Sequence, residues 1–228
     1  MHFDRGAFDD FIIENDVVGF FDKPVTLKSG RISHWYVNWR KVAGDAYLVD
    51  CLADYLLAFC RDLELNPDGF YGVPEGATKL GVISTYKLAK SSGRFAKGSH
   101  CLSMGRAKPK EHGVPADRYF VGAPSGQVVV VEDVTTTGGS LISELAKLKE
   151  AAVNVVAAIG LTNRMELASD GRSVKDAVNA AGVRYHALSD ATSFLPVAYA
   201  KKAPGAEIGK AIEDEFNRYG VSPLTLLK

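Results

Sequence analysis

Residues 128–140 read VVVVEDVTTTGGS and bring several kinds of reactive group together. Glu132 and Asp133 carry acceptor-only carboxylates, which suit the hydroxyl groups of a sugar. After them come hydroxyl side chains and two glycines, which allow close backbone approach to a ligand where a helix with unpaired N–H groups is expected to begin. These residues are Thr135, Thr136, Thr137, Gly138, Gly139 and Ser140. The stretch predicts a cradle for one phosphate group, with the two acids on the attached sugar.

A simpler interpretation is that residues 135–140 only cap a helix and that the acids lie on a solvated strand end. The density of acids, hydroxyl groups and glycines favours the phosphate site. The stretch lacks the Gly-Lys-Ser/Thr ending of a P-loop and the spaced glycines of a dinucleotide-binding fold. It resembles the phosphoribosyl pyrophosphate (PRPP) motif of type I phosphoribosyltransferases.

The elements that must position this motif alternate along the chain. Strands are predicted near residues 69–73, 100–104, 127–132, 154–161 and 184–188, with helices over 77–90, 139–150 and 174–181. Such alternation indicates crossover connections and an α/β fold with a mostly parallel sheet flanked by helices. The run of valines 128–131 is typical of a central strand buried on both faces. Ligands of these sheets bind beyond the carboxyl ends of the strands.

The two ends of the chain lie outside this alternation. An amphipathic helix is predicted over residues 3–18, and short strands over 25–27 and 34–39 flank a turn at Ser29-Gly30. Asp45 is expected to cap a helix that ends near Arg61. The tail after residue 203 carries a helical stripe of apolar residues, which predicts packing and not a site.

Composition excludes several classes of protein. The chain has 228 residues, 46% of them hydrophobic, and its 27 Lys and Arg balance 27 Asp and Glu. It is therefore expected to be globular, and a zero net charge gives no overall attraction to nucleic acid or an anionic membrane. No apolar stretch reaches the ~20 residues of a membrane span, and the acidic start is unlike a signal peptide, so a cytoplasmic location is predicted.

The three cysteines, Cys51, Cys60 and Cys101, show no CxxC spacing. Their odd number and their spacing argue against a disulfide framework and against a zinc site.

Three further segments resemble one group within that class, the orotate phosphoribosyltransferases. Residues 26–31, TLKSGR, match a segment whose lysine contacts substrate or pyrophosphate, here Lys28. In the group, nearby aromatic residues cover the base, and an aromatic ring can stack on a planar one, so Trp35 or Tyr36 is expected to do so here. In the group, residues corresponding to Gly72, Val73, Pro74, Glu75 and Gly76 form the pyrophosphate loop, which acts through its backbone N–H groups. Some bacterial relatives have a lysine in place of Gly76, and Lys79 is expected on the helix surface.

Residues 106–113, RAKPKEHG, resemble the mobile catalytic loop of the group. The resemblance gives Arg106, Lys110 and His112 roles in catalysis, with Lys110 as the main electrostatic catalyst and Asp133 as a further catalytic group. Relatives usually have a second basic residue where this chain has Ala107, and Lys108 is expected to replace it. Arg164 matches an arginine of the orotate site, where a guanidinium fork suits a planar carboxylate.

The resemblance implies transfer of ribose 5-phosphate from PRPP to orotate, giving orotidine 5′-monophosphate and pyrophosphate in de novo pyrimidine biosynthesis. It implies Mg²⁺ held mainly by PRPP, with no protein metal site, and a homodimer in which loop 106–113 is shared between subunits. Residues 1–228 are expected to form one domain, with 1–40 as a base-binding hood and 191–228 as a helical extension. Two alternatives stay open: another nucleobase as acceptor, or a non-catalytic regulator that senses PRPP or a nucleotide.

Overall fold

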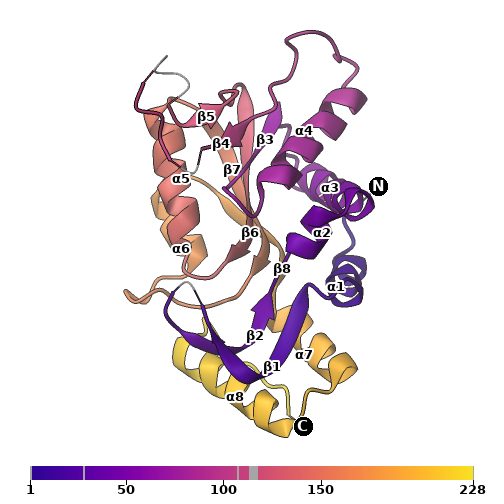
Figure 1. The fold of residues 1–228 in the computed structure, drawn as a ribbon, viewed down its shortest axis with the longest axis vertical. Coiled ribbons are helices and arrows are strands. Elements are labelled where there is room, and N and C mark those ends of the chain that lie inside the picture. Colours follow the sequence, from indigo (N-terminus) through magenta and orange to yellow (C-terminus); the bar gives the residue numbers. More distant parts are fainter. Residues whose placement is uncertain (1, 28, 107, 113–117, 228) are drawn as a thin grey trace.

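The computed structural model describes residues 2–27, 29–106, 108–112 and 118–227. Its centre is a four-stranded parallel sheet in the order β3-β6-β7-β8 (Figure 1). The strands are β3 (Gly69–Gly72), β6 (Gln127–Thr135), β7 (Asn154–Asn163) and β8 (Tyr185–Asp190). The predicted α/β fold with a parallel sheet is therefore confirmed.

Helices cover both faces of the sheet, and the valines of β6 divide between the two sides. Helices α3 (Ala46–Asp62) and α4 (Thr78–Ser91) lie on one side, and α5 (Gly139–Glu150) and α6 (Val174–Ala180) on the other (Figure 1). Val129 and Val131 belong to the hydrophobic cluster that includes α3, whereas Val128 and Val130 belong to the cluster that includes α5. Alternate side chains of a strand point to opposite faces, so this central strand is buried on both.

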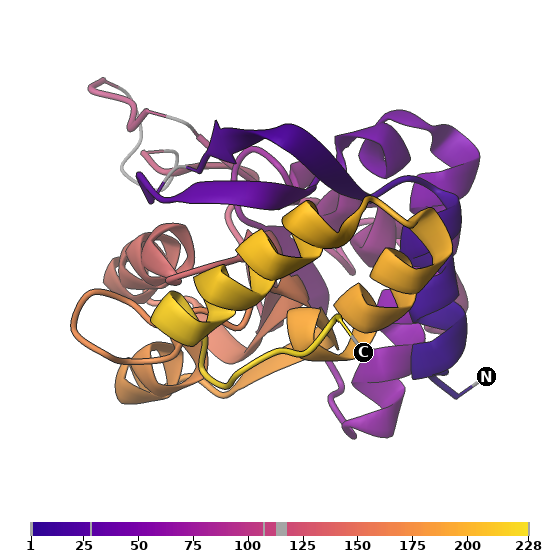
Figure 2. The same ribbon diagram turned by 90° about the horizontal axis from the view of Figure 1, so that it is seen from below.

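A second layer of elements lies below the carboxyl ends of β6 and β7. Strands β1 (Val18–Thr26) and β2 (Ile32–Val37) form an antiparallel hairpin that does not join the central sheet. The C-terminal helices are α7 (Ala191–Lys202) and α8 (Ala206–Tyr219), and α8 runs along the hairpin (Figure 2). The hairpin is therefore supported from beneath by a helix that lies far away in the sequence.

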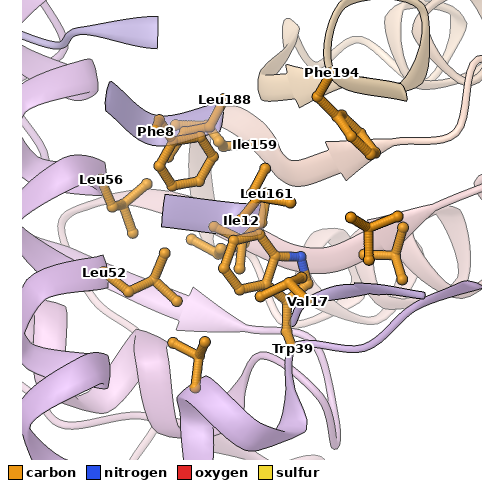
Figure 3. Packing of buried hydrophobic residues seen from close by; sticks show 14 of the residues in the cluster. Phe8, Ile12, Val17, Trp39, Leu52, Leu56, Ile159, Leu161, Leu188 and Phe194 are labelled. Atoms are coloured by element: carbon orange, nitrogen blue, oxygen red, sulfur yellow. The ribbon is translucent and has the colours of Figure 1, made fainter. Parts of the chain in front are cut away.

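The N-terminal helix α1 (Arg5–Glu14) and the short helix α2 (Arg40–Gly44) pack against the hydrophobic core. Phe8 and Trp39 stack with their ring centroids 5.8 Å apart, and Ile12 packs in the same cluster as Leu52 and Leu161 (Figure 3). Burial of such side chains is the main stabilising contribution to a fold of this kind. Among the described residues, none of the helices combines the length and apolar character needed to cross a bilayer.

Four predicted elements differ clearly from the structure. The short strand expected over 25–27 is only the end of β1, which begins at Val18. Helix α1 ends at Glu14 and not near Val18, because Asp16 adopts a left-handed φ of 51° that turns the chain into β1. Residues 100–103 form no strand: β4 (Met104–Gly105) is two residues long and pairs antiparallel with β5 (Phe120–Val121), outside the central sheet. Strand β6 continues past residue 132 to Thr135, so both acids lie within the strand.

Candidate active site

A cavity of about 1010 Å³ opens at the carboxyl ends of β3 and β6, below α5 and against the hairpin. Each wall comes from a different part of the chain, which the parallel sheet and the hairpin bring together. The lining comprises Leu27, Ser29, Tyr36, Val37, Asn38, Arg40, Ala43, Val73, Pro74, Glu75, Gly76, Lys79, Glu132, Asp133, Val134, Thr135, Thr136, Thr137, Gly138, Gly139, Ser140, Leu141, Ser143, Glu144 and Arg164.

The predicted phosphate cradle forms one wall of the cavity. Strand β6 ends at Thr135 and α5 begins at Gly139, so the turn between them brings hydroxyl groups and the first N–H groups of the helix to the same place. Gly138 has φ of 81°, and a Cβ at this position would lie 2.8 Å from Cγ2 of Val174. A glycine is required there for both conformation and space. The first turn of α5 contains no acidic residue that would repel an anion.

One hydroxyl group of the predicted cradle is engaged elsewhere. Thr135 is 1% exposed, and its Oγ1 forms a 2.5 Å hydrogen bond with the hydroxyl of Tyr185 on β8. The bond passes over Gly160 of β7, where a Cβ would lie 2.6 Å from the tyrosine oxygen. Burial raises the pKa of Tyr185, so the phenol stays protonated. Thr135 therefore anchors the end of β6, and Thr136, Thr137 and Ser140 line the cavity beside it.

The acids and the predicted pyrophosphate loop meet at the same cavity. Oδ1 of Asp133 accepts a hydrogen bond from the Val134 N–H at 2.8 Å. A Cβ on Gly76 would lie only 2.1 Å from Oδ2 of the same carboxylate. The carboxylate thus rests directly on the loop backbone, in the space that any side chain at position 76 would need. Glu132 is 6% exposed and lines the same cavity.

Four of the five predicted loop residues, Val73 to Gly76, line the cavity, whereas Gly72 does not. A Cβ on Gly72 would lie 2.0 Å from the carbonyl oxygen of Ala77, so this glycine lets the chain fold back on itself after β3. The Pro74-Glu75 peptide bond is cis.

Arg164 lies at the cavity but is almost completely enclosed by its partners. Its Nε donates to Glu166 at 2.7 Å, and its Nη2 donates to Glu215 at 2.9 Å and to Ser33 at 3.2 Å. Only Nη1, which makes a 3.4 Å contact with the Trp35 carbonyl, has spare donor capacity. The expected free guanidinium fork is therefore absent, because two buried glutamates occupy it.

The two aromatic candidates of β2 lie on opposite faces of the hairpin. Tyr36 lines the cavity. Trp35 is fully buried, with the Arg164 guanidinium 3.7 Å from its ring centroid and the Phe216 ring 6.2 Å away. The expectation that Trp35 covers a base is therefore wrong for this structure, since its ring is enclosed in the core. Tyr36 is the aromatic residue that is positioned to do so.

The described residues of the basic segment do not line the cavity of their own chain. Arg106 donates from Nε to the Phe120 carbonyl at 3.2 Å, and the Lys110 N–H donates to the Arg118 carbonyl at 2.8 Å. These bonds hold the segment against the chain that returns through β5. Figure 1 shows it beside β4 and β5, at the end of the molecule opposite the hairpin.

The other predicted residues of this segment share its position. Like Arg106 and Lys110, Lys108 and His112 do not belong to the cavity lining. Ala107 and Gly113 lie outside the described residues, as does Lys28 of the TLKSGR segment.

Two cationic residues of the lining were not predicted as site residues. Lys79 was expected on the helix surface, but its side chain lines the cavity from the first turn of α4. Arg40 lines it from the start of α2, directly after β2. The sequence signal for both is their position just beyond a segment that faces the site. Among the described residues, no group of three His, Cys, Asp or Glu side chains is arranged to hold a metal ion.

A parallel sheet with this turn between β6 and α5 and these acids at the strand end is the architecture of the type I phosphoribosyltransferases. No family model matches the chain. It is 34% identical over 178 residues to the orotate phosphoribosyltransferase of Bradyrhizobium diazoefficiens, covering 75% of this chain and 87% of that protein. The chain belongs to the orotate phosphoribosyltransferase family.

Two further comparisons extend over nearly the whole chain. The orotate phosphoribosyltransferase of Agathobacter rectalis is 27% identical over 231 residues, with 95% of this chain and 97% of that protein covered. The crystal structure of orotate phosphoribosyltransferase from Francisella tularensis superposes with a TM-score of 0.68 at 21% identity, covering 94% of this chain and 99% of that one. This likeness in structure shows that the fold is shared.

Proposed function

We propose that this chain transfers ribose 5-phosphate from PRPP to N1 of orotate, releasing pyrophosphate and giving orotidine 5′-monophosphate. The observation that supports the proposal is one cavity lined by residues 135–140, by Glu132 and Asp133 and by the loop 73–76, in a member of this family. We further propose that the reaction serves de novo pyrimidine biosynthesis in the cytoplasm.

The cavity suggests a specific arrangement of PRPP. The 5′-phosphate would bind Thr136, Thr137 and Ser140 together with the backbone around Gly138 and Gly139, as hydroxyl and N–H donors require. Glu132 and Asp133 would accept hydrogen bonds from the ribose hydroxyl groups. The pyrophosphate would then lie along the loop 73–76, because Asp133 rests on Gly76.

Orotate would bind on the hairpin side of the same cavity. Tyr36 offers an aromatic face to the planar ring. Nη1 of Arg164 can give the carboxylate one charge-assisted hydrogen bond, since the other guanidinium nitrogens are held by Glu166 and Glu215. Lys28 remains a proposed anion ligand on the strength of the TLKSGR resemblance.

In the reaction the C1–O bond of PRPP breaks and its electron pair leaves with pyrophosphate, while N1 of orotate bonds to C1 and loses its proton. The ribose becomes oxocarbenium-like and negative charge concentrates on the leaving group. Catalysis by this chain would therefore be positional and electrostatic, with no side-chain nucleophile. Lys110, with Arg106, Lys108 and His112, would stabilise the leaving pyrophosphate once their segment covers the site.

A magnesium ion fits the donors that the cavity offers. The carboxylate and hydroxyl oxygens of the lining are hard ligands, and Mg²⁺ commonly keeps waters and substrate oxygens in its coordination shell. When bound, the ion would neutralise charge on pyrophosphate. We propose that PRPP holds most of its coordination sites, with Asp133 and Glu132 acting on the ribose hydroxyl groups beside it.

We also propose a homodimer that shares loop 106–113 between subunits. The described basic residues of that loop lie away from the cavity of their own chain, which supports a role in the cavity of another copy. Residues 1–228 would act as one domain, in which 1–40 form the base-binding hood and 191–228 support it.

The test is to mix the purified protein with PRPP, Mg²⁺ and orotate and to follow the loss of orotate absorbance. Uracil, hypoxanthine and adenine serve as parallel acceptors. We expect Mg²⁺-dependent consumption of orotate alone. Consumption of a different base would move the proposal to another phosphoribosyltransferase, and PRPP binding with no consumption of any base would favour a regulator.

A further inference from the structure

Lys79 is a residue of the cavity lining that the functional assignment leaves unexplained. It lies in the first turn of α4, and it lines the same cavity as the loop 73–76, which it follows in the chain. The side chain is exposed, and its ammonium group has no ion-pair or hydrogen-bond partner among the described residues. Lys87 of the same helix, in contrast, is held by Asp50 at 2.8 Å and Asp54 at 2.9 Å.

The stability of the helix does not account for this lysine. The N-terminus of a helix carries a partial positive charge, so a cation in the first turn is repelled. Nothing within the first turn of α4 offsets that repulsion: it contains no acidic residue, and the N-cap Ala77 makes no side-chain hydrogen bond. An anion bound in the cavity would be attracted both by the Lys79 ammonium group and by the N-terminus of α4, and would offset the repulsion between them.

The charges of the lining point to the same conclusion. Of the three cationic residues in the described lining, Arg164 is neutralised by Glu166 and Glu215. Lys79 and Arg40 remain as cations that no carboxylate of the described residues engages. PRPP brings several negative charges into a cavity whose wall already contains acids. Lys79 adjoins the loop 73–76, whereas Arg40 lies beyond the end of the hairpin strand β2.

We propose that Lys79 is a catalytic residue that binds the pyrophosphate group of PRPP. The inference rests on the proposed function and adds a residue to it. A side chain at position 76 would displace the Asp133 carboxylate, because a Cβ there would lie 2.1 Å from Oδ2. Lys79 brings a positive charge to the same cavity from α4, and it leaves the Asp133 carboxylate in place.

Calorimetric titration of the full chain in the presence of Mg²⁺ tests this assignment. The ligands are PRPP, inorganic pyrophosphate and orotidine 5′-monophosphate, which has no pyrophosphate group. We expect Lys79→Gln to weaken binding of PRPP and pyrophosphate by about tenfold or more, as for the loss of a charge-assisted hydrogen bond, and to leave the nucleotide affinity unchanged. Lys79→Arg should restore most of the loss.

Lys90→Gln is the matched control, because Lys90 lies on the same helix but outside the cavity lining. It should bind all three ligands like the unmodified protein. Equal pyrophosphate affinity in Lys79→Gln and the unmodified protein would overturn the assignment of Lys79 alone, as would an equal loss for all three ligands. Failure of the unmodified protein to bind PRPP and orotidine 5′-monophosphate would overturn the proposed function together with it.

Discussion

The Asp133 carboxylate lies directly against the backbone of Gly76, so its position depends on the absence of a side chain there. The carboxylate can rest on the loop only because residue 76 has no side chain, since a Cβ would lie 2.1 Å from Oδ2. In this structure the present position of the carboxylate and a side chain at position 76 exclude each other. Asp133 and the loop are therefore one unit of the site, although they come from β6 and the turn after β3.

We expect Gly76→Ala to lower kcat/KM for PRPP by about tenfold to a hundredfold, because turning the Asp133 carboxylate away costs a charge-assisted hydrogen bond to the ribose. Steady-state kinetics with PRPP varied would measure the effect. Gly44→Ala is the control, because a Cβ at Gly44 meets no atom within 4 Å. Full activity of Gly76→Ala would show that the carboxylate does not need its present position.

The place of a single residue could be predicted from the sequence where the residues that act together are also neighbours in the chain. The cradle residues Thr136 to Ser140 follow one another in the chain, so their grouping needed no tertiary information. Trp35 and Arg164 were different. Neighbours on a strand face opposite sides, and sequence alone does not say which of two aromatic residues faces the core. The partner of Arg164, Glu215, lies on α8, so the occupied guanidinium could not be foreseen.

At the scale of elements, α8 takes part in building the site through a buried charge network. Glu215 accepts hydrogen bonds from Ser33 of β2 and from Arg164 beyond β7, each at 2.9 Å. Arg31 joins the network by donating to Glu166 at 2.8 Å. One helix thus fixes both the hairpin and the arginine that faces the cavity.

Glu215→Ala should lower the free energy of unfolding by about 3 kcal/mol, because removing one member of a buried ion pair leaves the other charge uncompensated. Urea denaturation would measure the loss. Asp214→Asn, the neighbouring control, removes an exposed ion pair with Lys210 and should change stability by less than about 1 kcal/mol. Equal stability of the two variants would mean that α8 is not held by this network.

The same contrast between local and distant contacts explains which helices and strands could be predicted from the sequence. Helix α5 has the predicted bounds, and Asp45 caps α3 by accepting hydrogen bonds from the Tyr47 and Leu48 N–H groups at 2.9 Å, because capping is decided within a few residues. The strand expected over 100–104 is absent before Met104, since a strand needs a partner and β5 reaches only β4. The support of the hairpin by α8 likewise depends on contacts across the whole chain.

At the scale of the whole molecule, the ionisation of the Asp9 carboxyl makes the free energy of unfolding depend on pH. Burial raises the pKa of the Asp9 carboxyl from 3.8 to about 6, against the attraction of Arg5 and with a contribution from Asp190. A group whose pKa is raised by folding stabilises the folded state below its unfolded pKa, and this contribution is lost as the pH rises through the folded value. The loss therefore falls between about pH 4 and pH 6.

Asp9→Asn should accordingly be more stable than the unmodified protein at pH 7.5, by about 1 kcal/mol once solvent screening is allowed for. The advantage should shrink as the pH falls below about 6. Thermal denaturation at several pH values would measure it. Asp214→Asn, which removes an exposed ion pair with Lys210 and is not among the groups that shift the Asp9 pKa, should show no such trend. A stability difference that stays constant with pH would contradict the assignment to Asp9.

The distance between the described basic residues and the cavity of their own chain bears on how whole molecules assemble. Lys110 is exposed and lies outside the lining of its own chain's cavity, whereas Asp133 lines it. If the segment serves a second copy, one active site combines Lys110 of one subunit with Asp133 of the other. Lys110→Ala and Asp133→Asn would then damage different halves of a shared site, each lowering turnover because its interaction strengthens in the transition state.

Co-expression of the two variants provides the test. Random pairing makes about half of the dimers mixed, and each mixed dimer has one intact site out of two, so activity should recover to about a quarter of the unmodified value. Co-expression of Lys110→Ala with His112→Ala is the control, because both changes lie in the same segment and no mixed dimer contains an intact one. If each segment acted on the cavity of its own chain, mixing Lys110→Ala with Asp133→Asn would create no intact site, and the activity would remain at the level of the separate variants.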